Sequence, residues 1–272
     1  MTPSQQSKLF VRFNVEFKSS VDVTLIQSMG SDAMLASAAW VSTSAQQGLR
    51  RAVENPDDVR GVINYLIKHR HGTPFEHSAM TFCVKAPIFV WREWHRHRIG
   101  FSYNEESARY KQLDPVFYIP ARDRPMVKVD GWKPGRPKFL TLDQSMALVT
   151  DMEHFGDIAE AAADQKYDEI VSDMKQGYKD EYARYERQLS RQLDPGLARD
   201  CLPVGIYSSC WVTCNPRSLM SFLSLRVGSE EATFRSYPLH EIELGALACE
   251  EMFKQGWPIT HAAFVLNGRV AP

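Results

Sequence analysis

The stretch from Phe89 to Tyr110 limits what this 272-residue chain can fold into. It begins with apolar residues, and six of its 18 positions between 92 and 109 then carry basic side chains: Arg92, His95, Arg96, His97, Arg98 and Arg109. Like charges crowded this closely repel one another, and an anion between them removes the repulsion. We therefore expect the fold to place this stretch beside an anionic ligand.

The charge of the whole chain narrows the choice of anion. The formal net charge is −1 and the sequence pI is about 6.7. A protein that binds DNA through bulk electrostatics usually presents a whole basic face. The positive charge here is local, which favours a small anionic ligand and predicts no nucleic-acid partner.

The cysteines and the hydropathy pattern indicate where the protein works. The five cysteines (Cys83, Cys201, Cys210, Cys214 and Cys249) are odd in number and include no CxxC pair. Such usage predicts buried thiols in a reducing compartment. No apolar run approaches the ~18 residues of a membrane span, and no apolar signal core stands at the start of the sequence. We expect a cytoplasmic protein without a membrane partner.

Apolar periodicity predicts one mixed α/β domain over residues 1–272, with a central sheet and long helices. Alternation predicts strands over 10–17, 21–26, 79–84 and 206–214. Helical spacing and start signals predict helices over 33–41, 55–69, 88–97, 140–189, 194–203, 219–227 and 238–253. Gly30-Ser31-Asp32 is expected to supply a turn and the N-cap of the first helix, and residues 102–107 to form a polar loop. Five prolines predict a surface loop over about 111–140.

Arginines gather in two separate parts of the chain, 92–109 and 199–226. Arginine binds phosphate through a planar, bidentate fork, so a phosphorylated small molecule would suit both groups. The sequence has no P-loop lysine motif, no GxGxxG and no GxSxG. Histidines at 69, 71 and 77 lack the spacing of metal ligands, so no metal is predicted. The residues alone thus indicate a nucleotide-directed, anion-binding α/β enzyme.

One motif takes the interpretation further. Arg96-His97-Arg98, followed after eight residues by Ser107, resembles the signature of the flavin-dependent thymidylate synthases. Other segments resemble that family in the same order along the chain: 71–77, 84–90, 202–203, 215–220 and 225–226. The resemblance covers roughly residues 21–118 and 180–265.

This resemblance implies a complete reaction. Members of the family methylate dUMP at uracil C5 to give dTMP, with methylenetetrahydrofolate as the carbon donor. NADPH reduces the FAD that provides the hydride. The family has a mixed α/β fold and assembles as a homotetramer whose active sites lie at subunit interfaces. Its route needs no cysteine nucleophile, so the cysteines of this chain can be structural.

The resemblance also implies roles for individual residues. The dUMP contacts would be Glu93, Trp94, His95, Arg96, Glu105, Glu106, Ser107, Ala108, Arg109, Arg199 and Arg226. The FAD contacts would be Ser42, Thr73, Glu76, Arg96, His97, Arg98, Glu105, Asn215, Arg217 and Ser221. Arg226 would be catalytic, because a fixed guanidinium beside the uracil ring favours its N3-ionised form and makes C5 more nucleophilic. Glu93 stands where many members have Gln, and Arg92 or Arg96 is expected to neutralise it.

Two other functions remain open on the sequence. In the first, Trp91, Trp94 and the arginines would form a stacking and phosphate patch for single-stranded nucleic acid. Such binding would be steeply salt-dependent, and the balanced net charge argues against it. In the second, the protein would bind flavin without having synthase activity.

Overall fold

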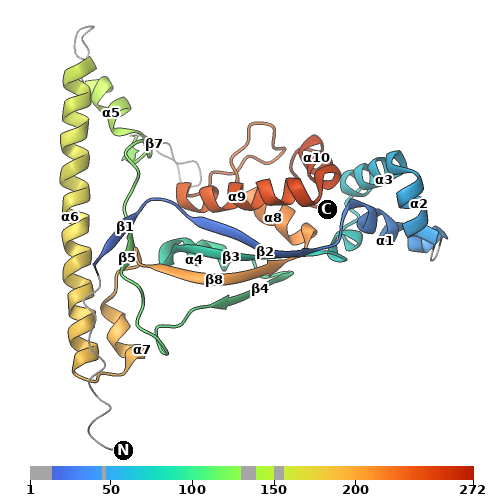
Figure 1. Ribbon diagram of the computed structural model, residues 1–272. Helices are drawn as coiled ribbons and strands as arrows, with labels where there is room; N and C mark the ends of the chain where they lie inside the picture. Colours follow the sequence, from blue (N-terminus) through green and yellow to red (C-terminus); the bar gives the residue numbers. More distant parts are fainter. Residues whose placement is uncertain (1–13, 45–46, 130–138, 150–155) are drawn as a thin grey trace, which may run out of the picture.

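The computed structural model describes residues 14–44, 47–129, 139–149 and 156–272. Its centre is a four-stranded antiparallel sheet in which β8 lies between β3 and β4. In spatial order the strands are β2 (Asp22–Met29), β3 (Ala79–Pro87), β8 (Tyr207–Cys214) and β4 (Phe101–Glu105). The mixed α/β architecture expected from the sequence is confirmed (Figure 1).

One face of this sheet forms the floor of the main core. Phe82 of β3 lies opposite Val212 of β8, and Val84 lies opposite Cys210. All four are at most 1% exposed. Side chains alternate across a strand, so the neighbours of these residues point to the other face, where Trp211 is 53% exposed. The sheet is therefore covered on one side only.

Helices cover the apolar face of this sheet. Those that pack on it are α4 (Ile88–Trp94), α8 (Pro216–Arg226) and α9 (His240–Gly256). A helical group extends the core at one end: α1 (Asp32–Ser44), α2 (Gly48–Glu54), α3 (Pro56–Lys68), the 3₁₀ turn η3 (Thr73–Glu76) and α10 (Pro258–Leu266). The expected inward face of α9 is confirmed, since its residues at 242, 246, 249 and 253 are at most 1% exposed.

A long helix stands at the opposite edge of the molecule (Figure 1). This is α6 (Gly156–Ser190), whose 35 residues span about 50 Å. Short elements accompany it: β1 (Glu16–Lys18), β5 (Val116–Tyr118), β6 (Val127–Lys128), β7 (Phe139–Leu140), α5 (Leu142–Val149), α7 (Pro195–Ala198) and the 3₁₀ turn η4 (Arg199–Cys201). Phe117 stacks on Tyr178 of α6 with ring centroids 4.8 Å apart, which joins α6 to the main body.

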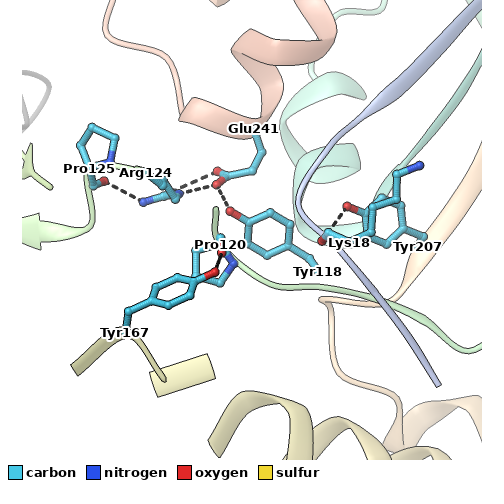
Figure 2. Close-up of polar contacts among 8 residues, drawn as sticks. All are labelled: Lys18, Tyr118, Pro120, Arg124, Pro125, Tyr167, Tyr207 and Glu241. Carbon is cyan, nitrogen blue, oxygen red and sulfur yellow. Dashed lines mark hydrogen bonds and ion pairs between the residues drawn. The ribbon is translucent and has the colours of Figure 1, made fainter. Parts of the chain in front are cut away.

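A buried carboxylate ties these two parts together (Figure 2). Glu241 at the start of α9 is 1% exposed and accepts hydrogen bonds from Tyr118 of β5 and from Arg124. Burial would raise the pKa of Glu241, but these bonds hold it below its ordinary value. Burial and the bond to Glu241 also raise the pKa of Tyr118. The carboxylate is therefore ionised and fixes the 118–125 segment to α9.

Several local predictions prove wrong, each because tertiary pairing overrides a local signal. β3 continues through Ala86 to Pro87, where the sequence predicted a break, since both residues pair with β8. Residues 101–105 form strand β4 and not a loop, for the same reason. Helix α4 ends at Trp94, not at His97.

The N-terminal and proline-rich predictions are only partly testable. Residues 10–13 of the strand expected over 10–17 lie outside the described residues, and β1 is confined to Glu16–Lys18. The 111–140 segment is not a plain loop, because it contains β5, β6 and β7, while 130–138 lies outside the described residues. In the part of the chain that the structure describes, no helix has the length and apolarity to cross a membrane. All five cysteines are free thiols, three of them buried.

The run Gly30-Ser31-Asp32 supplies the expected N-cap through Ser31, and Asp32 has another role. Ser31 Oγ accepts from the Met34 N–H, so Ser31 caps α1. The Asp32 carboxylate instead accepts from the N–H groups of Ile259 and Thr260, both at 2.9 Å, and from the Thr260 hydroxyl. It therefore caps α10, which is more than 220 residues away along the chain, from a position only 7% exposed.

Replacing Asp32 with Ala leaves these donors buried without a partner. We expect Asp32→Ala to lower the free energy of unfolding by about 2–4 kcal/mol. Urea unfolding followed by far-UV circular dichroism measures the change. Asp57→Ala, an exposed acid in the first turn of α3, is the control and should cost at most about 1 kcal/mol. Equal midpoints for Asp32→Ala and the unaltered protein would contradict the assigned role.

Candidate active site

The signature residues Arg96–Arg98 form the turn between α4 and β4. Gly100 completes this turn at φ 68°, where a Cβ atom would lie 2.1 Å from Ser218 Oγ and 2.9 Å from Asn215 Nδ2. The Tyr103 hydroxyl donates to the carbonyls of Trp94 and His97, the latter at 2.6 Å. The turn is thus fastened both to β4 and to the start of α8.

Arg226, at the end of α8, meets this turn from the C-terminal half of the chain. Its Nη1 donates to Glu93 Oε2 at 2.6 Å, and its Nε donates to His97 Nε2 at 3.0 Å. Burial, and next the charge of Arg226, lower the pKa of His97 to about 4. His97 is therefore neutral at pH 7, with Nε2 unprotonated as an acceptor. Arg226 is the partner that neutralises Glu93, so the expected pairing with Arg92 or Arg96 is wrong.

A second group forms where η3 meets the start of α8. Arg217 Nη1 donates to Glu76 Oε1 at 2.6 Å, and both side chains are 43% exposed. The Asn215 side chain caps α8 by accepting from the Ser218 N–H at 2.8 Å. Free N–H groups and the helix dipole make the N-terminus of an 11-residue helix favourable for an anion. We name Thr73, Glu76, Asn215 and Arg217 the η3–α8 group.

A third group lies beyond the other end of β4. Arg199 Nε donates to the Gly196 carbonyl at 3.3 Å, and a Cβ atom at Gly196 would lie 3.6 Å from Arg109 Cγ. Ser107 Oγ accepts from the Arg109 N–H at 3.3 Å. Two exposed arginines and a serine hydroxyl are suited to hold a phosphate. We name Ser107, Arg109 and Arg199 the β4–α7 group.

The remaining candidates differ in what they can contact. Glu106 accepts from the Ser209 N–H at 2.7 Å and pairs with Lys111 at 2.8 Å, so its carboxylate supports the backbone of β8. Trp94 and Ala108 are 1% and 3% exposed, and they pack in the core and place their neighbours. Three of the remaining candidate residues have exposed side chains: Ser42, Glu105 and Ser221. His95 packs against Tyr103 and Trp91.

The structure separates the third group from the first two. β4 runs from Phe101 beside the signature turn to Glu105, four residues or about 13 Å away. The sequence interpretation, with nucleotide and flavin sides on one continuous stretch, did not include this separation. It also missed Tyr103 and Lys111, which carry no signal beyond residue type.

Comparisons with known proteins show which proteins this chain resembles. Residues 24–259 match the family model described as thymidylate synthase complementing protein. The chain is 42% identical over 258 residues to a flavin-dependent thymidylate synthase from Streptomyces coelicolor, with 95% of this chain and 96% of the relative covered. It is also 42% identical to the Tropheryma whipplei enzyme of that name, with 97% and 98% covered.

A solved structure is similar over nearly the same length. It is a UMP/dUMP methylase, PolB from Streptomyces cacaoi, bound with 5-Br dUMP. The TM-score is 0.80 at 34% sequence identity, with 95% of this chain and all of that chain covered.

The Arg226–His97 contact makes a prediction about protonation. Arg226→Ala removes the neighbouring charge and opens the pocket around the ring, so the pKa of His97 should rise from about 4 toward its ordinary value of about 6.5. NMR titration of the imidazole carbons measures this. Arg92→Ala is the control. Arg92 lies on α4, before His97 in the chain, and its loss should leave the titration of His97 unchanged. An unshifted His97 in Arg226→Ala would refute the contact.

Proposed function

Because the chain belongs to the flavin-dependent thymidylate synthase family, we propose that the arginine groups described above bind its nucleotide substrate and its flavin. The protein is an FAD-dependent enzyme that methylates dUMP to dTMP. We further propose that methylenetetrahydrofolate is the carbon donor and NADPH the reductant. The contact between Arg226, Glu93 and His97 carries the proposal, since it places a half-buried guanidinium beside the signature turn.

In this proposal Arg226 prepares the uracil for methylation. Its side chain is 18% exposed, so little water screens its charge. A guanidinium fixed there would stabilise negative charge on the uracil ring, and an N3-ionised ring is more nucleophilic at C5. Glu93 and His97 orient Arg226 from two sides, and a neutral His97 adds no competing positive charge. Glu93, Trp94, His95 and Arg96 would form this side of the dUMP site.

The η3–α8 group fits FAD. FAD carries a pyrophosphate, and this group offers a helix N-terminus, the Thr73 hydroxyl and the Arg217 guanidinium. When bound, FAD supplies the hydride for the reaction. We propose that Arg96, His97, Arg98, Glu105, Ser42 and Ser221 complete its contacts.

We propose that a complete site needs two copies of this chain. The β4–α7 group would hold the dUMP phosphate, yet β4 keeps it away from Arg226 within one chain. A second copy could bring its own Arg109 and Arg199 to Arg226 of the first. This arrangement supports the homotetramer with interfacial sites that the family resemblance implies, with Glu105 and Glu106 on the β4–α7 side.

Co-expressing two inactive variants tests the shared site. Arg226→Ala and Arg199→Ala should each abolish most dTMP formation. Randomly mixed oligomers should recover about a quarter of the unaltered activity if each site takes one group from each of two chains. Tagging each variant differently confirms that the mixed species is assayed. No recovery in the mixed species would show that each chain builds its own site.

The reaction itself has a direct test. Purified protein should bind FAD, turn yellow, and consume NADPH faster when dUMP is added. Complementation of a thymidine-requiring host distinguishes a synthase from a protein that only binds flavin. UMP should be assayed beside dUMP, because the similar solved structure is a UMP/dUMP methylase. Protein that cannot be loaded with FAD, or that binds single-stranded nucleic acid with a steep salt dependence, would contradict the proposal. The cytoplasmic location and the single-domain boundary stay predictions.

A further inference from the structure

The segment Arg269–Pro272 packs against the η3–α8 group, although none of its residues belongs to the site described above. After α10 the chain reverses through Gly268 at φ 71° and Arg269 at φ 57°. Figure 1 shows the C-terminus beside α8 and α3. We name Arg269–Pro272 the C-terminal segment.

A buried ion cluster anchors the beginning of this segment. Arg269 Nη2 donates to Glu250 Oε2 at 2.7 Å, and His261 Nε2 lies 2.9 Å from Glu250 Oε1. The side chains of Arg269 and Glu250 are 8% and 11% exposed. Burial would raise the pKa of Glu250, but the bonds from His261 and Arg269 hold it at about 2. The cluster therefore keeps Arg269 in a left-handed conformation that an arginine rarely adopts.

Two further arginines hold the end of the segment through its main-chain oxygens. Arg70, itself at φ 62°, donates from Nη1 to the Ala271 carbonyl at 3.0 Å. Arg217 donates from Nε to the main-chain oxygen of Pro272 at 2.8 Å. Pro272 is buried by these contacts.

The second of these bonds fixes the arginine that faces the flavin site. The main-chain oxygen of Pro272 accepts a hydrogen bond from Nε of Arg217, and Glu76 accepts one from Nη1. Gly72 lies so close that a Cβ atom there would be 2.4 Å from Nε. The guanidinium is therefore held on one edge and at Gly72. Among the described residues its Nη2 has no hydrogen-bond partner, and the side chain is 43% exposed, so Nη2 keeps its donor capacity for a ligand.

We propose that the C-terminal segment is a positioning element for FAD binding, which acts by orienting Arg217. The inference rests on the proposed function, since it assumes that the η3–α8 group binds FAD. An arginine fork that is already oriented loses less conformational freedom when it binds a pyrophosphate. Without the main-chain oxygen of Pro272, Arg217 would keep its charge, but its guanidinium would no longer be held in one orientation.

FAD affinity, measured by the quenching of flavin fluorescence, tests the proposal in the 272-residue chain. Deleting Ala271 and Pro272 should weaken FAD binding about tenfold and leave dUMP affinity unchanged. Arg70→Ala should weaken it less, and Arg70→Lys should restore part of the loss. Arg60→Ala, on the helix α3 that precedes Arg70, is the matched control and should bind FAD normally.

A double-mutant cycle separates positioning from a general loss of stability. In an Arg217→Ala background the deletion should weaken FAD binding no further, because the residue through which it acts is gone. Thermal unfolding of each variant shows whether the fold is retained, and the two Arg70 variants leave the main chain complete.

The outcomes distinguish this inference from the proposed function. Absence of FAD binding by the unaltered protein would overturn both. Tight FAD binding by the unaltered and the shortened protein alike would overturn the inference alone. If the losses of FAD affinity caused by the deletion and by Arg217→Ala add fully, the inference alone is also overturned.

Discussion

The pairing of β8 between β3 and β4 is the constraint on which the rest of the structure depends. β8 comes from residues 207–214, more than 100 positions after β4, and it pairs antiparallel with both neighbours. Its Cys214 lies opposite Phe101, so the chain leaving β8 enters α8 beside the signature turn. This register brings Asn215 to the 96–100 turn, and α8 carries Arg226 to the same turn. Sliding β8 by one residue would turn its buried side chains to the open face.

Paired charges stabilise the arginines that this arrangement gathers. Arg226 pairs with Glu93 and Arg217 with Glu76, while Arg124 and Arg269 pair with the buried Glu241 and Glu250. The crowding of basic residues suggested that an anion must complete the cluster. In the chain by itself, carboxylates of the protein supply part of that negative charge. An entering phosphate or pyrophosphate would share these arginines with the carboxylates, so affinity depends on how well each guanidinium is oriented.

Local signals in the sequence were sufficient to predict helices with a clear apolar periodicity or a clear N-terminal start signal. The Asn55-Pro56-Asp57-Asp58 run predicted α3, which begins at Pro56, and the apolar spacing of α9 predicted its buried face. They failed where another strand supplies the decisive hydrogen bonds. Residues 101–105 are polar enough to suggest a loop, yet β8 makes them a strand. Asp32 belongs to the run that was expected to begin α1, but its carboxylate reaches α10.

The sequence by itself determined the residue types of the site, its family and the reaction, because ordered motifs such as Arg96-His97-Arg98 and Ser107 depend only on order along the chain. Tertiary structure alone decided which residues meet. Arg226 neutralises Glu93, β4 separates Arg109 and Arg199 from Arg226, and Pro272 reaches Arg217. These contacts join residues 55 to 133 positions apart, and only packing of the whole chain fixes distances on that scale.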